Sequence, residues 1–238
     1  MEQERLKTES LTGIVNVLYE DNHIIAVLKP AGIPVQKGGR KQSLDLVVKD
    51  YLKKKYKKPG NVFLGIVHRL DQPVSGIILF AKTSKGASRL SEQFREKELE
   101  KTYRAVLVGK LKNKRGILKS RIRKEKGGYF RAVIDGPAYG EPQDKKGKEA
   151  ELEYKIVKEG AKNSLVEIKL GTGRFHQIRA QFSSIGHPVL GDVKYGSPMV
   201  LPGGKIALHS SKITFVAATG DRKVELAVSD PAYFKELL

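Results

Sequence analysis

Short apolar segments separated by turn residues are the feature of this sequence that most restricts its fold. Residues 15–19, 23–29 and 101–107 have the length and the β-branched or aromatic content of strands. Connections between such segments are short, as at Asp21-Asn22, which is a favourable turn pair. Segments with helical spacing are fewer. This pattern predicts an α+β fold around a largely antiparallel sheet.

The balance of charge is the compositional feature that bears on function. Lys and Arg total 45 against 26 Asp and Glu, which gives a formal net charge of +19. A field of this sign concentrates polyanions at the surface, so a nucleic acid is the expected partner. The alternative is a highly charged protein with no polyanionic partner. Nothing in the sequence resembles an amphipathic helix that binds anionic lipid.

The sequence also indicates where the protein acts. Residues 1–12 are polar and charged, no apolar stretch approaches the roughly 18 residues of a membrane span, and no cysteine is present. These features predict a cytoplasmic protein with no membrane contact, disulfide or thiolate metal site. We expect a polar extension at residues 1–12, then a single domain at residues 13–238 that acts as a monomer.

The segment that begins at Ser43 predicts the first helix. Ser43 can cap it, and apolar residues then recur at helical spacing between Leu44 and Leu52. A basic run at residues 53–58, with five lysines, comes before Pro59-Gly60. Because positive charge suits a helix C-terminus, this run is explained either as a solvated helix end or as a surface that faces RNA.

Arg69 and Asp71 stand two residues apart in HRLDQPVSG, residues 68–76, between two apolar runs. In extended backbone, residues i and i+2 project to the same side, so the two side chains could pair directly. A guanidinium beside the carboxylate would keep Asp71 ionised, as a nucleophile or a base requires. In isolation such a pattern is more often a structural ion pair. The turn at residues 73–76 places it on a polar bend, where active sites commonly lie.

A second candidate segment is GTGRFHQIRAQ, residues 171–181. Thr172 can cap a helix that begins near Gly173, and the backbone amides at its start could meet an anion. The helix would bury a stripe formed by Phe175, Ile178 and Phe182. Its polar residues are candidates for contacts with an anion or with neighbouring groups, or are simply solvated: Arg174, His176, Gln177 and Arg179.

Several classes of enzyme are disfavoured by motifs that the sequence lacks. The five histidines show no metal-binding spacing, no phosphate-binding glycine loop or dinucleotide fingerprint follows a strand, and no GxSxG motif occurs. The sequence therefore predicts a reaction that uses no metal ion and no nucleotide cofactor. A Mg²⁺ site built from carboxylates alone would leave little trace in a sequence.

Taken together, the segments resemble the RluA-type family of RNA pseudouridine synthases. Residues 29–36 (KPAGIPVQ) are similar to the family's first conserved loop, and residues 68–83 (HRLDQPVSGIILFAKT) to its catalytic motif. Residues 172–196 are similar to its third motif, and residues 101–107 (KTYRAVL) resemble the segment that supplies its active-site tyrosine. The similarity spans residues 13–230.

The resemblance implies a single catalytic domain, with a largely antiparallel mixed β-sheet, flanking helices and a central cleft. It implies that the chain isomerises uridines in ribosomal or transfer RNA to pseudouridine without a cofactor. Asp71 corresponds to the catalytic aspartate, and Arg69 to the residue that helps displace the target base. Tyr103 corresponds to the tyrosine packed against the uracil and Arg179 to the basic residue paired with the aspartate. Leu208 corresponds to an apolar residue beside the base.

The sequence departs from the family pattern in three respects. Gln72 stands where many members have arginine and Gln181 where many have histidine, and both are expected to affect the choice of RNA more than the chemistry. The chain begins almost directly with catalytic-domain sequence, so the small N-terminal RNA-binding domain of many relatives is not expected. The charge of +19, including the basic region at residues 110–148, is then expected to carry RNA binding itself.

The chemistry implied by the resemblance suits these residues. The glycosidic bond must be broken, the uracil rotated and the bond remade through carbon, which needs a nucleophilic carboxylate but no redox cofactor or metal. Attack on the sugar and attack on the base both stay open. One rival hypothesis is a catalytically silent RNA-binding or ribosome-assembly protein of the same fold, which should tolerate loss of Asp71. Another is a nuclease or glycosidase, which would require paired acids or metal ions.

Overall fold

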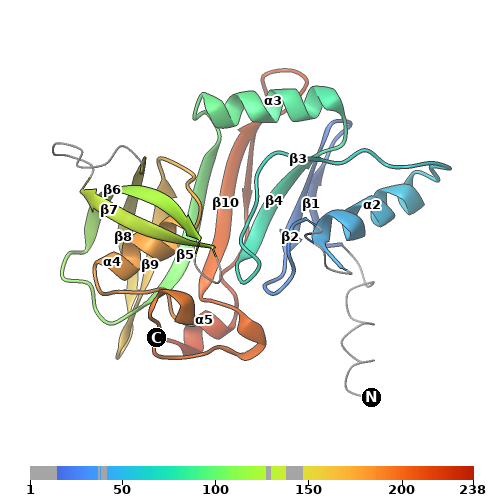
Figure 1. Cartoon of the computed structure of the whole chain (residues 1–238). Coiled ribbons are helices and arrows are strands. Elements are labelled where there is room, and N and C mark those ends of the chain that lie inside the picture. The colour runs from blue at the N-terminus through green and yellow to red at the C-terminus, as the bar shows by residue number, and fades with distance from the viewer. Residues whose placement is uncertain (1–14, 37, 39–41, 127–129, 138–146) are drawn as a thin grey trace, which may run out of the picture. The chain divides into compact units, whose positions relative to one another are not determined.

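The computed structural model of the protein describes residues 15–36, 38, 42–126, 130–137 and 147–238 (Figure 1). The chain forms two compact units. The first consists of Met1–Leu99 with Ile213–Ala227, and the second of Glu100–Lys212 with Val228–Leu238. None of the helices in the described ranges is long and apolar enough to cross a membrane.

The first unit is built on strands β1, β2 and β4, in that order in the sheet, followed by β10. β1 pairs antiparallel with β2, and β2 with β4; β3 also pairs with β4, and β11 with β10. Its elements are β1 (Val17–Glu20), β2 (Ile24–Lys29), α2 (Leu44–Lys55), β3 (Gly65–Ile66), β4 (Ser75–Ala81), α3 (Ser84–Arg95), the end of β10 (Leu208–Val216) and β11 (Lys223–Ala227).

The core of this unit lies around β2 and β4. All side chains from Ile24 to Val27 and from Ile77 to Ala81 are fully buried, so these strands are apolar on both faces. α3 packs against β3 and β4. Thr83 is the N-cap of α3, and its hydroxyl accepts a hydrogen bond from the Gly86 amide (3.1 Å).

The second unit is an antiparallel meander in which the sheet order is β10-β5-β9-β8-β6-β7. β8 and β9 form a hairpin across residues 160–162, with Tyr154 opposite Ile168. α4 packs against β6 and β7. The elements are β5 (Glu100–Val108), β6 (Arg115–Lys126), β7 (Phe130–Pro137), β8 (Lys148–Glu159), β9 (Asn163–Leu170), α4 (Gln177–Ser184), η1 (Val193–Tyr195), η2 (Pro202–Gly204), the start of β10 and α5 (Tyr233–Glu236).

The predicted α+β class with a largely antiparallel sheet is confirmed. Leu208–Val216 form one continuous strand, β10. Ser43 occupies the N-cap of α2, but its hydroxyl bonds the Asp45 carboxylate and does not cap the helix. The extension predicted at residues 1–12 lies outside the described residues. A single domain over residues 13–238 stays a prediction.

The start of α4 differs from the prediction. The helix begins at Gln177 and not near Gly173, because Thr172 bonds strand β8 and does not cap the helix. Its hydroxyl oxygen accepts from the Glu151 amide (2.9 Å) and donates to the Gln177 side chain (2.8 Å). Phe175 therefore precedes the helix and is 38% exposed, while Ile178 and Phe182 are buried as predicted.

Candidate active site

Asp71 lies in an irregular loop between β3 and β4. Leu70 and Val74 are buried on either side of it, and the Val74 amide donates a hydrogen bond to the Asp71 carbonyl (3.1 Å). This turn leads directly into β4, whose residues are all buried. The carboxylate of Asp71 is therefore presented at the end of a rigid core strand, where the partly buried loop residue can be held in one position.

The loop at residues 29–36 supplies a buried cation near Asp71. Lys29, the last residue of β2, has no exposed surface, and its ammonium donates to the carbonyls of Pro30 (2.9 Å), Ile33 (2.8 Å) and Gln72 (3.1 Å). Burial lowers the pKa of Lys29 to about 7, and the nearby charge of Asp71 opposes this effect. Three carbonyl acceptors match the three N–H donors of an ammonium, so the contacts favour the charged form.

Gln72 joins the same two loops. Its carbonyl accepts from the Gly32 amide (2.8 Å), and its side-chain amide donates to the Gly32 carbonyl (2.9 Å). Gly32 has a φ of 93°, a conformation that disfavours residues with a Cβ. Gln72 thus has a structural role next to Asp71, which the sequence alone did not reveal.

His68 attaches the start of the catalytic segment to β4. The Leu79 amide donates to Nε2 of His68 (2.9 Å), so this nitrogen is an acceptor and carries no proton. The imidazole ring also lies 5.0 Å from the ring of Phe94 on α3, centroid to centroid. The histidine of the HRLD sequence therefore positions the loop.

The direct pairing of Arg69 with Asp71 that extended backbone would allow is not present. Residues 67–72 are not a strand, so the i, i+2 rule does not apply to them. Arg69 is exposed and makes no ion pair within the described part of the chain. Lys29, in the same unit, is a cation on which the charge of Asp71 acts.

Tyr103 and Leu208 are the apolar candidates of the second unit. Tyr103 lies on β5 opposite Ile168 and is 7% exposed, and Leu208 begins β10 and is 3% exposed. Lys101 stands two residues before Tyr103 on the same strand face, and burial lowers its pKa. A Cβ on Gly173 would lie 3.3 Å from the Lys101 ammonium nitrogen, so glycine here leaves room for that cation.

Arg179 is fixed by a buried acid. On α4, it donates from Nε and Nη2 to the two oxygens of Asp192 (2.6 and 2.9 Å), and both residues are buried. The guanidinium also lies 4.9 Å from the ring centroid of Tyr195. A bidentate pair of this kind fixes the plane of the arginine. Sequence reasoning missed Asp192, although its position 13 residues further on is within the same motif.

Gln181 and His176 complete the support of α4. The Gln181 amide donates to the carbonyls of Leu118 and Ala150 on β6 and β8, at 3.0 and 3.2 Å. His176 precedes the helix with a left-handed backbone (φ 50°), and its Nδ1 lies 2.8 Å from the Tyr195 hydroxyl. Both residues position the helix that carries Arg179.

The candidate residues therefore fall into two sets. Arg69 and Asp71 belong to the first unit; Tyr103, Arg179 and Leu208 belong to the second. Within the described ranges, no three histidine, aspartate or glutamate side chains are grouped so that they could hold a metal ion.

Comparison with known proteins identifies the family. The model of the RNA pseudouridylate synthase family matches residues 23–184, which include both candidate segments. The ribosomal large subunit pseudouridine synthase C of Rickettsia bellii is 36% identical over 93% of this chain and 70% of its own length. An uncharacterized RNA pseudouridine synthase of Bacillus subtilis is 35% identical over 94% of this chain and 72% of its own length. The chain belongs to the RluA-type pseudouridine synthases.

A solved structure agrees with this fold. The human RNA pseudouridylate synthase domain containing 4 superimposes with a TM-score of 0.78 and 22% identity, covering 99% of this chain and 95% of that chain. As a pseudouridine synthase, the protein is an isomerase that acts on uridine in RNA. Membership of this family explains why the segments at residues 68–76 and 171–181 carry residues suited to catalysis and binding.

Proposed function

We propose that Asp71 is the nucleophile of this pseudouridine synthase. The observation that carries the proposal is that a buried ammonium stabilises the loop that contains Asp71. This ammonium, of Lys29, donates to the Gln72 carbonyl and lies near the Asp71 carboxylate. An ionised carboxylate is the form able to attack the nucleoside. The interlocked backbone of Gly32 and Gln72 limits the movement of the loop.

The reaction that Asp71 would assist is balanced without any further reagent. The bond between N1 of uracil and C1′ of the ribose breaks, and a bond between C5 and C1′ forms. C5 loses a proton and N1 gains one, so the product is an isomer and nothing is oxidised or reduced. The carboxylate could attack the sugar or the base, and the net reaction is the same in both cases. In each case the bond between Asp71 and the nucleoside breaks again before the product leaves.

The other candidate residues have distinct roles in this proposal. Arg69, exposed on the Asp71 loop, would enter the RNA and help to displace the target base. Tyr103 would pack against the uracil, with Leu208 as a further apolar contact. Arg179, whose Nε and Nη2 are held by Asp192, would use the remaining edge of its guanidinium to pair with Asp71.

We further propose that the substrate is large-subunit ribosomal RNA. Support comes from relatives that are 35–36% identical to this chain and are named ribosomal large subunit pseudouridine synthases. Transfer RNA is the second candidate substrate. The absence of cysteine suits a protein of the reducing cytoplasm, where we propose that it acts as a monomer.

Purified enzyme and unmodified transcripts test the substrate proposal. The enzyme is incubated with large-subunit ribosomal RNA, and separately with pooled transfer RNA transcripts, and new pseudouridines are mapped at nucleotide resolution. We expect modification at one or a few uridines of the ribosomal transcript. Modification of transfer RNA alone would overturn the proposed substrate while leaving the proposed chemistry in place.

A further inference from the structure

We propose that the lysine-rich end of α2 is a second RNA-contacting surface, which binds phosphates of the substrate at a distance from the Asp71 loop. The proposal rests on the RNA substrate of this family and adds a site that the catalytic motifs do not include. The surface consists of Lys53, Lys54, Lys55, Lys57 and Lys58 with Tyr56, and we call it the α2 basic surface.

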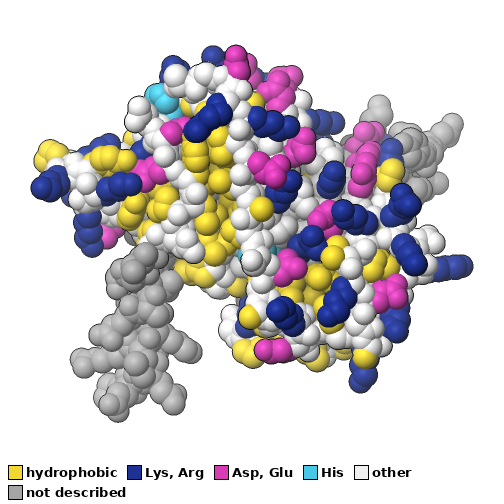
Figure 2. All heavy atoms as spheres, turned by 180° about the vertical axis from the view of Figure 1, so that it is seen from behind, with side chains coloured by type: hydrophobic (Ala, Val, Ile, Leu, Met, Phe, Trp, Pro, Cys, Tyr) yellow, Lys and Arg dark blue, Asp and Glu magenta, His cyan; other side chains and the backbone are white. Residues whose placement is uncertain are grey.

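The α2 basic surface is open to solvent and has an excess of positive charge. All six of its residues are exposed. Lys54 pairs with Asp50 (2.7 Å) and Lys55 with Glu20 (2.6 Å). Lys53, Lys57 and Lys58 make no ion pair within the described ranges. At the left edge of Figure 2, where the end of α2 projects, Lys and Arg side chains gather.

Helix stability accounts for only part of this run. Lys53, Lys54 and Lys55 lie in the last turn of α2, where positive charge interacts favourably with the helix dipole. Lys57 and Lys58 lie beyond it. Their backbone amides close the helix by donating to the carbonyls of Lys54 (3.3 Å) and Lys53 (3.0 Å), and their side chains are not required for this.

Lys57 also occupies a position where glycine would be more stable. Its φ is 49°, the left-handed conformation in which a Cβ is unfavourable, and it follows the C-cap of the helix. A lysine at this position adds charge at a cost in stability, so its substitution can separate binding from folding.

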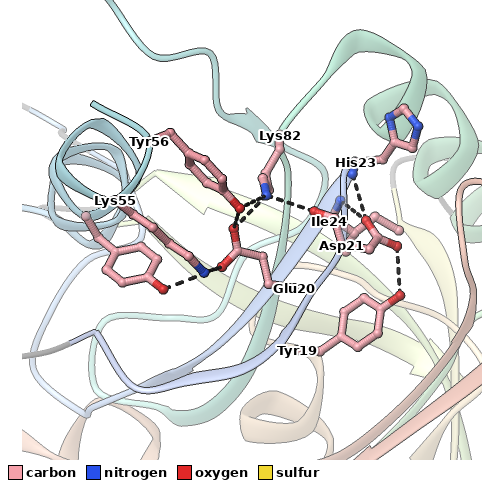
Figure 3. A network of polar contacts seen from close by, with 9 residues as sticks. Tyr19, Glu20, Asp21, His23, Ile24, Lys55, Tyr56 and Lys82 are labelled. Carbon is pink, nitrogen blue, oxygen red and sulfur yellow. Dashed lines mark hydrogen bonds and ion pairs between the residues drawn. The ribbon is translucent and has the colours of Figure 1, made fainter. Parts of the chain in front are cut away.

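Polar contacts beneath the surface hold it in place (Figure 3). The Tyr56 hydroxyl donates to Glu20 (2.6 Å), and Lys82, at the end of β4, donates to Glu20 (2.6 Å) and to the Tyr56 oxygen (3.0 Å). Lys55 also bonds Glu20 (2.6 Å). Glu20, the last residue of β1, therefore connects the end of α2 with Lys82, which follows β4.

Several cations of strand β6 are compensated by acids. On β6, Lys119 pairs with Glu151 (3.0 Å), and Arg123 pairs with Glu125 (2.8 Å) and with Asp135. The sheet register also places Arg121 opposite Glu149. Polyanion binding depends on cations that are not already neutralised, so the α2 basic surface is the better phosphate-binding candidate.

The position of the surface predicts which RNA it affects. Asp71 precedes β4 and Lys82 follows it, so the seven residues of the strand, at about 3.3 Å each, separate the two by roughly 20 Å. A contact at that distance requires an RNA that extends several nucleotides beyond the target. The α2 basic surface should therefore favour long structured RNA over a short hairpin.

A charge-matched pair of variants tests the proposal. The test variant carries Lys53→Gln, Lys57→Gln and Lys58→Gln; the control carries Lys85→Gln, Lys97→Gln and Lys223→Gln, three exposed lysines of the same unit. Each loses three positive charges, so the effect on the overall field is the same. Equilibrium binding to an unmodified large-subunit ribosomal RNA transcript is measured at several salt concentrations, together with pseudouridine formation in that transcript and in a short hairpin containing the target.

We expect the test variant to bind the transcript at least about tenfold more weakly than the control at 0.1 M salt. The slope of log affinity against log salt should fall by about 2, since each lost phosphate contact removes about 0.7–0.9. KM should rise on the transcript and stay unchanged on the hairpin. Equal binding by the two variants would overturn the proposal. Failure of the wild-type protein to modify the transcript would instead contradict the proposed substrate, and the binding comparison would stand.

Lys57→Gly separates binding from folding. The change relieves the left-handed strain, so we expect a higher Tm together with weaker RNA binding than wild type. A variant that is more stable and still binds RNA as tightly as wild type would show that this lysine has no part in the surface.

Discussion

Lys29 is the residue that connects the first loop of the chain with Asp71. Its ammonium bonds a carbonyl of the catalytic loop 43 residues away, at Gln72. The sequence places Lys29 at the end of an apolar strand and at the start of the loop KPAGIPVQ, but it does not reveal the role of Lys29, because the contacts that define this role are tertiary. Asp71 and Arg69, in contrast, are part of a local motif and could be selected from the sequence alone.

Substitution of Lys29 tests this connection. In Lys29→Met the carbonyls of Pro30, Ile33 and Gln72 lose their donor, and Asp71 loses the adjacent charge. We expect kcat to fall at least about tenfold with little change in KM, and stability to fall by roughly 2–3 kcal/mol. Steady-state kinetics below the measured Tm, with exposed Lys85→Met as the control, checks this. Wild-type kcat in Lys29→Met would contradict the assigned role.

Tyr103 carries a second prediction for a single residue. Its side chain is buried on β5, and the proposal assigns the ring, not the hydroxyl, to contact with the uracil. Tyr103→Phe keeps the ring, so it should lose less activity than Tyr103→Ala. Turnover of both variants on the same transcript decides the point, and the opposite order would assign the contact to the hydroxyl group.

Among the elements, α2 and α4 show what a local pattern does and does not predict. Helical spacing located both helices. The start of α4 was placed too early, because Thr172 bonds the neighbouring strand β8. A sequence cannot show whether a cap residue will bond its own helix or a strand brought beside it by the fold.

Glu20 gives a prediction for the attachment of α2. Burial raises the pKa of Glu20, but hydrogen bonds from Lys55, Lys82 and Tyr56 outweigh it and bring the pKa to about 2, from 4.5. A lowered carboxyl pKa contributes stability above about pH 4.5, and this contribution is lost as the pH falls towards 2. Glu20→Gln should therefore be about 1–2 kcal/mol less stable than wild type near pH 6.

Denaturant unfolding at several pH values measures this effect. The difference between wild type and Glu20→Gln should shrink as the pH falls from 5 towards 2. A difference that stays constant with pH would show that the charge of Glu20 is not what fastens the helix. Asp50→Gln, which removes an exposed partner of Lys54 on the same helix, is the matched control and should change stability by less than about 0.5 kcal/mol.

For the whole molecule, composition predicted the partner correctly but not the place where it binds. The net charge of +19 pointed to a polyanion, and the family acts on RNA. The expectation that the basic region at residues 110–148 carries RNA binding covers residues partly outside the described ranges. Where the structure describes it, two cations of β6, Lys119 and Arg123, pair with acids on β8 and β7. Net charge alone does not show which cations are already neutralised.

The role of Asp71 is the central claim, and single-turnover pseudouridine formation by Asp71→Asn tests it most directly. The assay uses enzyme in excess over the large-subunit ribosomal RNA transcript, with RNA affinity measured on the same samples. We predict no detectable product and an affinity within about twofold of wild type, because phosphate contacts dominate the binding of RNA. Product formation at an appreciable fraction of the wild-type rate would contradict the assignment of Asp71 as the nucleophile.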